Sequence, residues 1–419
     1  MARRLLPRLS VVFGKLCALS KYNDFSMGSG SCSELILLRW WLMTPDVVVV
    51  GGGPVGLAAA IAARLRGLEV LVADRAQPPI DKPCGEGVMP EGVSALRLLG
   101  VPVDDGALPF YGIRFTESGS SVEACFPAVA GHGIGIRRLH LHRLLVARAD
   151  EVGVVSRWRE PITAVNRSGV ELAGRNVPCR WVVGADGRES RVRRWAGFRP
   201  PSNVPRRIGF RQHFRARPWT DLVEVHWNNL GQAVVTPTAS DEVCISVFTS
   251  EPLSPMVKLI DHFPEISRRL NGALPASSVR GAISGSSSMR SVVSERVALI
   301  GDASGSVDAL TGEGLSMGFR HALALAEAFE RNNLAHYQVA HHQIGRMPER
   351  MARLMLFVGA RAWLRRRMLH ALAAQSQMFG LMLGAHVGAW SPTAIRPRVL
   401  AGFVRHLFAW NPLEDTEFV

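Results

Sequence analysis

A glycine-rich turn behind an apolar run is the first part of this 419-residue sequence with the composition of a ligand site. Gly51, Gly53 and Gly56 fit the spacing GxGxxG, and Asp74 follows 23 positions after Gly51. In such a turn, N–H groups at the start of a helix attract a pyrophosphate. An acidic side chain at the end of the next strand accepts a hydrogen bond from a ribose hydroxyl. The spacing therefore predicts a dinucleotide site.

The elements that must position this turn are evident on both sides of it. Val47–Val50 is a wholly apolar, β-branched run, which is typical of a strand inside a parallel sheet. Leu57–Arg66 reads as an Ala-rich helix and Val70–Ala73 as a second strand. Together they predict a βαβ unit. This fingerprint by itself does not distinguish FAD from NAD.

Four further segments carry a resemblance to a known family. Val182–Arg193 contains an Asp-Gly pair that resembles the DG motif of flavin-dependent hydroxylases, and Leu299–Ser304 resembles their third motif, in which an Asp binds the ribityl chain of FAD. Asp81–Gly87 looks like the KxCGxG segment of geranylgeranyl reductases, and Ile136–Leu141 resembles a helix start whose Arg faces the cofactor. Over residues 46–335 the chain resembles the p-hydroxybenzoate hydroxylase-like flavoproteins, closest to their geranylgeranyl reductase-like branch.

The resemblance implies an α/β fold with a Rossmann-type FAD-binding domain, an inserted antiparallel β-sheet substrate domain and a helical C-terminal region. Strand-like stretches between residues 111 and 249 mostly lack intervening helices, which favours the antiparallel layer. The expected parts are a poorly ordered extension at 1–42, a discontinuous FAD-binding domain at 43–105, 130–200 and 285–340, a substrate domain at 106–129 and 201–284, and a helical region at 341–419.

The resemblance also implies FAD as the bound cofactor. NADPH or NADH would act as a transient electron donor, because the chain has only one dinucleotide fingerprint. The residues expected to bind the cofactor are Gly51, Gly53, Pro54, Val55, Gly56, Asp74, Arg75, Arg138, Asp186, Gly187, Gly301, Asp302, Gly312, Gly314 and Leu315. The third motif departs from the family pattern, since Gly305, Ala309 and Ser316 stand where His, Pro and Asn are common. The sequence identifies no catalytic acid or base and predicts no metal site.

The implied function is that of an FAD-dependent oxidoreductase. The first expectation is a NAD(P)H-driven monooxygenase that hydroxylates an apolar or aromatic small molecule. The alternatives are a flavin-dependent reductase that saturates alkene bonds of a prenyl or lipid substrate, and a non-catalytic flavin-binding, membrane-peripheral protein. Gly314–Gly318 also matches the GxSxG motif of hydrolases, but that elbow requires a strand directly before the Ser. Cys84 is either a reactive thiol beside Lys82 or a buried turn residue.

The formal net charge of +14 is concentrated at the ends of the chain. Residues 345–410 hold ten Arg and one acidic residue, Glu349, whereas residues 43–344 are almost balanced. No helix-turn-helix, RNP motif or zinc-finger spacing accompanies this charge, so we do not expect nucleic-acid binding. Apolar residues, including Met351 and Met355, alternate with the arginines. The pattern predicts either a helical cover that meets a lipid-like substrate or an anionic membrane surface, or a helical lid that only packs on the FAD-binding domain, with Arg361–Arg367 as a solvated face.

Two further features bear on the location of the protein. Its six cysteines are scattered without metal or disulfide spacing, which suits a reducing compartment. Met368–Ile395 is uncharged but too polar and glycine-broken for a good transmembrane helix. We therefore expect a cytoplasmic protein with possible peripheral contact to an anionic membrane. The sequence says nothing about its oligomeric state.

Overall fold

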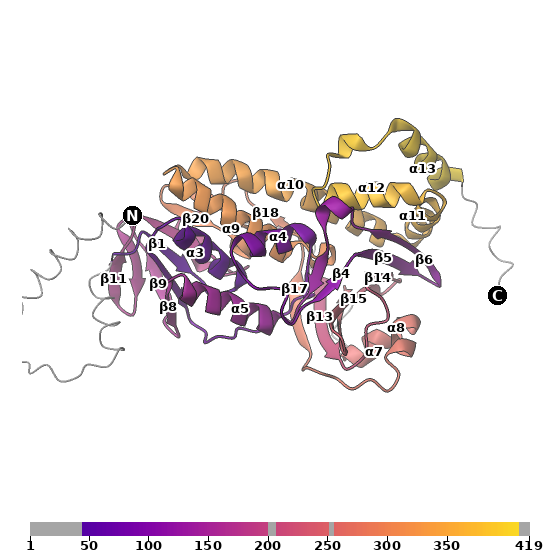
Figure 1. Cartoon of the computed structure of the whole chain (residues 1–419), viewed down its shortest axis with the longest axis horizontal. Coiled ribbons are helices and arrows are strands. Elements are labelled where there is room, and N and C mark those ends of the chain that lie inside the picture. The colour runs from indigo at the N-terminus through magenta and orange to yellow at the C-terminus, as the bar shows by residue number, and fades with distance from the viewer. Residues whose placement is uncertain (1–43, 200–206, 251–254, 410–419) are drawn as a thin grey trace, which may run out of the picture. The chain divides into compact units, whose positions relative to one another are not determined.

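The computed structural model of the chain describes residues 44–199, 207–250 and 255–409. The expectation for residues 1–42 lies outside these ranges. The described residues from Pro45 onward belong to one compact unit, which is built on two large sheets (Figure 1).

The first sheet carries the glycine turn. Its six strands run in the order β19-β20-β12-β1-β2-β8, and all neighbours are parallel except β19 and β20. The strands are β1 (Val47–Val50), β2 (Val70–Asp74), β8 (Val155–Trp158), β12 (Trp181–Gly184), β19 (Val293–Ser294) and β20 (Val297–Leu299). Helices pack around this sheet: α3 (Pro54–Leu65), α5 (Arg138–Glu151) and α9 (Gly314–Glu330). A small three-stranded sheet follows β8: β9 (Ile162–Val165), β10 (Gly169–Leu172) and β11 (Arg175–Pro178).

Two glycines in the turn between β1 and α3 are required by close backbone packing. Gly51 has φ +111°, and a Cβ atom there would lie 2.4 Å from the carbonyl oxygen of Ala185. A Cβ atom on Gly56 would lie 2.0 Å from the carbonyl oxygen of Gly51. No larger side chain fits at either position, so the fingerprint spacing reflects the local geometry of the turn.

The second sheet has seven strands in the order β17-β13-β16-β15-β14-β5-β6. They are β5 (Gly112–Glu117), β6 (Ser120–Cys125), β13 (Arg207–Phe214), β14 (Val223–Trp227), β15 (Gly231–Ala239), β16 (Glu242–Thr249) and β17 (Arg280–Ser284). The layer is antiparallel as expected except at one pair, because β14 runs parallel to β5. The hairpin β5–β6 comes from an earlier part of the chain, so its direction is not set by a tight turn into β14.

The side chains of this sheet alternate between two cores, as the period of a strand requires. On β15, Val234 packs with the C-terminal helices, whereas its neighbours Ala233 and Val235 pack with α7 (Met256–Asp261) and α8 (Pro264–Arg269). The C-terminal helices are α10 (Leu334–Gly359), α11 (Ala362–Ala374), α12 (Ser376–His386) and α13 (Pro397–Ala409). Figure 1 shows α11–α13 in yellow beside β5 and β6.

Shorter elements connect these parts. They are α4 (Pro90–Leu98), α6 (Arg191–Trp195), β3 (Gly87–Val88), β4 (Leu108–Phe110), β7 (Gly133–Gly135), β18 (Ser287–Ser288) and β21 (Gly305–Ser306), with single 3-10 turns at Ala128–Ala130, Gly301–Ser304, Ala309–Thr311 and Pro392–Ala394. The predicted fold class, a Rossmann-type domain with an inserted sheet and a helical C-terminal region, is confirmed. Among the described residues, no helix combines the length and the apolar character that crossing a membrane requires.

Candidate cofactor and substrate site

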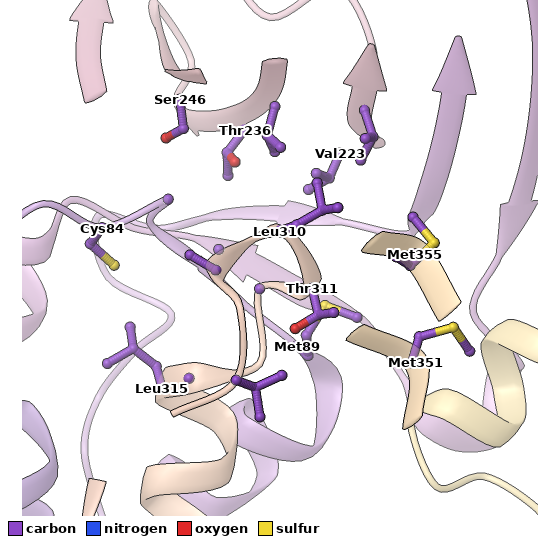
Figure 2. Close-up of a pocket in the computed structure, with 18 of the residues that line it drawn as sticks. Cys84, Met89, Val223, Thr236, Ser246, Leu310, Thr311, Leu315, Met351 and Met355 are labelled. Atoms are coloured by element: carbon purple, nitrogen blue, oxygen red, sulfur yellow. The ribbon is translucent and has the colours of Figure 1, made fainter. Parts of the chain in front are cut away.

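A cavity of about 340 Å³ lies between the glycine loops of the first sheet, one face of the second sheet and helices α10–α12. Figure 2 shows its extent: Cys84 and Leu315 lie at one end, and Met351 and Met355 on α10 lie at the other. Eleven of the fifteen residues expected to bind the cofactor line it: Gly53, Pro54, Val55, Gly56, Arg138, Gly187, Gly301, Asp302, Gly312, Gly314 and Leu315. Three motifs far apart in the sequence therefore meet at one cavity.

The lining at the glycine end fits a large anionic cofactor. A Cβ atom added at Gly53, Gly312 or Gly314 would meet nothing within 4 Å, so these residues leave open space beside the backbone. The Nε atom of Arg138 is buried and has no hydrogen-bond partner among the described residues. An anionic group in the cavity would satisfy it. Asp302 is exposed to the cavity, where its carboxylate is able to accept hydrogen bonds from a ligand.

Four of the expected residues do not line the cavity. Gly51 shapes the turn, and Arg75 is exposed on the surface. The Asp74 carboxylate accepts hydrogen bonds from the backbone N–H groups of Gly52, at 2.7 Å, and Ala76, at 2.8 Å. These bonds fix its orientation at the end of β2 and leave further lone pairs for a ligand.

Asp186, the fourth residue outside the lining, is occupied by the protein itself. Its carboxylate accepts hydrogen bonds from the hydroxyl of Ser190 and from the backbone N–H groups of Arg191 and Val192, at the start of α6. The acidic residue of this motif thus holds the turn after β12, and the adjacent Gly187 meets the cavity. The Asp186 carboxylate therefore acts indirectly, because it holds the turn that places the backbone of Gly187 at the cavity.

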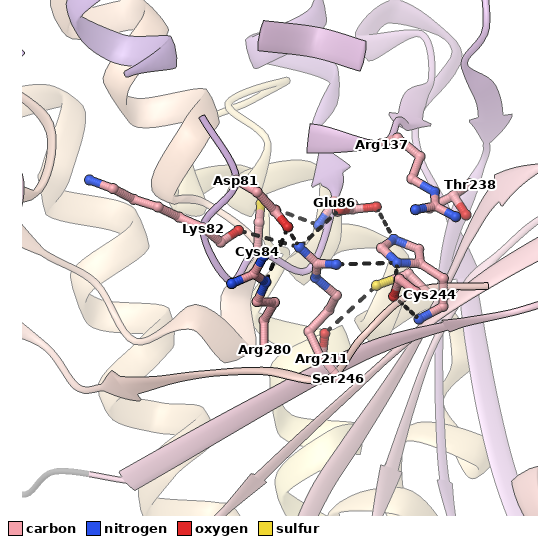
Figure 3. Close-up of polar contacts among 12 residues, drawn as sticks. Asp81, Lys82, Cys84, Glu86, Arg137, Arg211, Thr238, Cys244, Ser246 and Arg280 are labelled. Carbon is pink, nitrogen blue, oxygen red and sulfur yellow. Dashed lines mark hydrogen bonds and ion pairs between the residues drawn. The ribbon is translucent and has the colours of Figure 1, made fainter. Parts of the chain in front are cut away.

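A buried polar cluster beneath the segment Asp81–Gly87 holds that segment over the cavity (Figure 3). Arg211 on β13 donates to the Asp81 carboxylate at 2.8 Å, and His213 on the same strand contacts the Glu86 carboxylate. Arg137 pairs with Glu242 on β16. The segment is therefore tied to the second sheet through charged side chains that are largely removed from water.

Cys84, within this segment, lines the cavity, and its sulfur accepts a hydrogen bond from the backbone N–H of Glu86 at 3.3 Å. Burial raises the pKa of the Cys84 thiol, while the nearby Arg138 opposes this shift. A thiol is nucleophilic only as the thiolate. The structure therefore favours a neutral thiol at this position over a reactive one.

One group of three potential metal ligands occurs among the described residues: Glu86, His213 and Cys244, whose ligand atoms lie within 4.8 Å of one another. Arg211 lies 3.7 Å from the Glu86 carboxylate. The positive guanidinium disfavours a cation at the same place. We interpret the group as part of the polar cluster under the cavity.

The far end of the cavity is apolar and rich in aromatic side chains. Phe115 stacks on Trp227 with ring centroids 4.8 Å apart, and on Phe379 of α12 at 5.3 Å. Further lining residues are Phe110, Val223, Val225, Val234, Phe248, Met351, Leu354, Met355, Val358, Met368, Leu372, Met382 and Leu383. Flexible methionines suit a pocket for an irregular or long apolar group. The predicted helical cover thus contributes directly to the cavity wall.

Three polar residues in or beside the cavity had no clear signal in the sequence. His386 lines the cavity, and its Nε2 atom lies 2.9 Å from the Glu313 carboxylate. Glu91 on α4 has buried carboxylate oxygens, and burial together with the neighbouring Glu313 raises the pKa of Glu91 to about 9. Only the position of Glu313, between Gly312 and Gly314 of the third motif, could have marked it as a candidate. His386 and Glu91 come from segments that no motif covers.

Two sequence interpretations are settled by the fold. Ser316 lies inside α9 without a strand before it, and its Oγ accepts a hydrogen bond from the Met89 backbone N–H at 3.1 Å. This is not the nucleophile elbow of a hydrolase. The expectation that Arg361–Arg367 is a solvated face is wrong for Arg365, which is buried and bonded to Glu117, because the sequence does not show which arginine points at the sheet.

The comparisons with known proteins agree with this site. The model of the family described as "FAD binding domain" matches residues 44–111 and 139–332. The menaquinone reductase of Mycobacterium tuberculosis is 30% identical over 323 residues, which cover 69% of this chain and 78% of that protein. Digeranylgeranylglycerophospholipid reductase 1 of Methanopyrus kandleri is 37% identical over 168 residues, covering 37% of this chain and 43% of that protein.

Solved structures share the fold. A flavoprotein/dehydrogenase from Cytophaga hutchinsonii has a TM-score of 0.72 at 17% identity, covering 85% of this chain and 96% of that chain. The p-nitrophenol 4-monooxygenase of Pseudomonas putida has a TM-score of 0.69 at 19% identity, covering 87% of this chain and 98% of that chain. The chain belongs to the FAD binding domain family. It is an FAD-dependent oxidoreductase of the p-hydroxybenzoate hydroxylase-like superfamily, as the motifs predicted.

Proposed function

We propose that this protein is a NAD(P)H-driven monooxygenase that hydroxylates an aromatic substrate carrying an apolar chain. The observation that carries this proposal is the continuous cavity between the cofactor loops and the C-terminal helices. Its far end is bordered by the stacked rings of Phe115 and Trp227, which suit a planar aromatic group. Its far wall, with Met351, Met355 and Met368, suits an aliphatic chain.

In this proposal the residues at the glycine end hold FAD. Gly53, Gly312 and Gly314 allow close approach to the backbone, Arg138 binds an anionic oxygen, and Asp302 accepts from a hydroxyl of the ribityl chain. FAD supplies the redox chemistry when it is bound, and the protein contributes position and a water-poor environment. NADPH or NADH acts as a transient electron donor, so the chain does not need a second dinucleotide-binding fingerprint.

A reductase that saturates an alkene bond of a prenyl-bearing lipid is the second candidate. The names of the relatives favour it, since the menaquinone reductases cover more than two thirds of this chain and a digeranylgeranylglycerophospholipid reductase matches a shorter part. The same apolar cavity would accept a prenyl chain. The two reactions differ in the product, so a product analysis separates them.

The experiment is to supply the FAD-loaded protein with NADPH or NADH, oxygen, and either long-chain phenols or prenylated quinones. Mass spectrometry then identifies the product. Gain of one oxygen atom, with oxygen consumed, supports hydroxylation. Gain of two hydrogen atoms on the prenyl chain, located by fragmentation, supports alkene reduction, whereas the same gain on the quinone ring is only reduction to the hydroquinone. A protein that consumes NAD(P)H at the same rate with and without every substrate would contradict both proposals and leave the non-catalytic alternative.

We also propose peripheral contact with an anionic membrane through α13. Leu400, Val404 and Phe408 recur every four residues and are 46%, 41% and 69% exposed, so they form one apolar stripe on the helix surface. Arg398 and Arg405 on the same helix are exposed. An apolar stripe flanked by arginines matches a helix lying in the interface of an anionic leaflet.

Liposome co-sedimentation tests this contact. Full-length protein should bind vesicles that contain phosphatidylglycerol at low salt, and binding should fall at high salt and in a Leu400→Ser/Val404→Ser/Phe408→Ser variant. Glu327→Ser, an exposed substitution on α9, serves as the control and should leave binding unchanged. If the stripe variant binds vesicles as well as the wild type does, α13 is not the contact surface.

A further inference from the structure

The loop that follows the 3-10 turn Gly301–Ser304 and leads to helix α9 borders the cavity. We call residues 305–312 the third-motif loop. Five of them line the cavity wall: Val307, Ala309, Leu310, Thr311 and Gly312. The loop contains two glycines and no proline, so its own sequence restricts the backbone little. Contacts from outside the loop must therefore hold it in place.

Asp308, near the centre of the third-motif loop, is buried and does not itself line the cavity. Its carboxylate accepts a hydrogen bond from the Leu310 backbone N–H at 3.1 Å, which caps the following 3-10 turn. The backbone N–H groups of Asp308 and Ala309 donate to two hydroxyls, those of Ser286 at 3.0 Å and Ser284 at 3.1 Å. Ser284 is the last residue of β17, so these bonds attach the loop to one edge of the second sheet.

A charged contact also joins Asp308 to the second sheet. Arg207, the first residue of β13, donates to the Asp308 carboxylate and is the one cationic side chain within 4.0 Å of it among the described residues. The same guanidinium donates to the Gln232 side chain on β15 and lies 5.5 Å from the ring centroid of Phe248, which lines the cavity. Gln232 lies against the end of α10, since a Cβ atom on Gly359 would be 2.6 Å from its amide nitrogen. Arg207 therefore connects the third-motif loop with the wall of the apolar end.

The burial of this ion pair argues for a positional role. The side chains of Arg207 and Asp308 are 12% and 2% exposed, so both charges are largely removed from water. The cost of desolvating two buried charges offsets most of their attraction, and apolar side chains of similar shape often stabilise a fold equally well. A buried carboxylate nevertheless requires a charged partner at one defined place. Such a pair is better suited to fix the position of a loop than to add stability.

We propose that Arg207 is a positioning residue for the cofactor: through Asp308 it fixes the third-motif loop, and thereby the place of bound FAD relative to the apolar end of the cavity. Neither Arg207 nor Asp308 lines the cavity, so both act through the loop residues Ala309 and Leu310, which do. This inference rests on the placement of FAD at the glycine end that the proposed function includes. It goes beyond that function because it holds for hydroxylation and for alkene reduction alike.

The test separates the position of the cofactor from the stability of the fold. Arg207→Met alone would leave the Asp308 charge buried without a partner and should lower the melting temperature. The double variant Arg207→Met/Asp308→Asn removes both charges, while the Asn side-chain oxygen still accepts from the Leu310 N–H. We expect the double variant to melt near the wild type but to bind FAD at least about tenfold more weakly, a change of about 1.4 kcal/mol. The visible absorption bands of its bound FAD should also shift, because the loop beside the cofactor has moved.

A rescue variant links the effect to the conformation of the loop. Ala309 begins the 3-10 turn, where proline is favoured, and Asp308 before it has φ −56° and ψ 134°, an extended conformation that a following proline favours. Adding Ala309→Pro to the double variant should therefore restore FAD affinity and the absorption bands, although the N–H that donates to Ser284 is lost. Arg215→Met is the matched control, because it breaks an ion pair with Asp241 whose side chains are both exposed, and it should behave as the wild type.

Fluorescence titration of the apoprotein gives the Kd of FAD, and thermal unfolding of the apoprotein gives the melting temperature of every variant. Wild-type FAD affinity and absorption bands in the folded double variant would reject the positional role of Arg207. A loss of affinity confined to variants that melt early, or one that Ala309→Pro does not restore, would show an ordinary structural ion pair and overturn the proposal. These results do not depend on which product the enzyme forms, whereas a wild type that binds no FAD would overturn both this inference and the proposed function.

Discussion

Removal of Arg365 should destabilise the protein far more than removal of any neighbouring arginine. Arg365 on α11 donates to one oxygen of Glu117 from Nε at 2.9 Å and from Nη2 at 2.6 Å. It also donates to the Gly359 carbonyl at 2.8 Å and to Asn229 at 3.0 Å. The side chains of the pair are 3% and 4% exposed. Arg365→Met would leave the Glu117 charge buried without a partner, which costs about 3–5 kcal/mol.

Urea unfolding followed by tryptophan fluorescence measures this loss, with an unchanged m-value as the check on two-state behaviour. The double variant Arg365→Met/Glu117→Leu should recover most of the stability, because no unpaired charge remains. Arg366→Met is the matched control, since Arg366 is exposed one position further along, and it should change the free energy of unfolding by no more than about 0.5 kcal/mol. A loss below about 1 kcal/mol for Arg365→Met would refute the reasoning, because it would match an exposed pair.

The same variant has a functional consequence. Met368 and Leu372 lie one and two turns further along α11 and line the cavity. Loosening the helix should therefore weaken binding of a chain-bearing substrate, raising KM more than it lowers kcat. Equal kinetic parameters for folded Arg365→Met and wild type would show that α11 does not depend on this ion pair for its position.

Three other predictions follow from the site and its supports. Asp302→Ala should weaken FAD binding by about 1.5–3 kcal/mol, measured by fluorescence titration of apoprotein, because a charge-assisted hydrogen bond is lost; an unchanged Kd would contradict the role given to Asp302. Gly56→Ala should yield little FAD-binding protein, since its Cβ would lie 2.0 Å from the Gly51 carbonyl oxygen. Gly67→Ala is the control, because a Cβ atom there meets nothing within 4 Å and only the positive φ of 82° should cost stability. Burial lowers the pKa of His341 to about 4, so the unfolded state binds the proton more readily. The free energy of unfolding therefore keeps its full value above about pH 6.5 and falls by up to about 3 kcal/mol as the pH drops toward 4. Urea midpoints measured at several pH values should fall less with decreasing pH in His341→Gln than in the wild type.

Much of the cofactor end could be predicted from the sequence because its constraints are local. Gly56 is required by the carbonyl oxygen of Gly51, five residues earlier, and Gly51 itself has φ +111°, so the spacing specifies the turn. The apolar run Val47–Val50 fixes a buried strand in the same way. The methionines between the C-terminal arginines likewise predicted an apolar wall, and Met351 and Met355 contribute to it.

The tertiary structure alone decided which polar groups meet. His386, the last residue of α12, and Glu313, the residue before α9, are distant in the sequence and meet only through the packing of these helices. Arg365 looks like its neighbours in the sequence, but the orientation of α11 turns it toward Glu117. The sequence likewise did not predict that β14 pairs with β5 in parallel. Backbone geometry and apolar periodicity depend on residues that are close in the sequence, so the sequence alone predicts them. The partner of a buried charge depends on how distant elements pack, so only the tertiary structure identifies it.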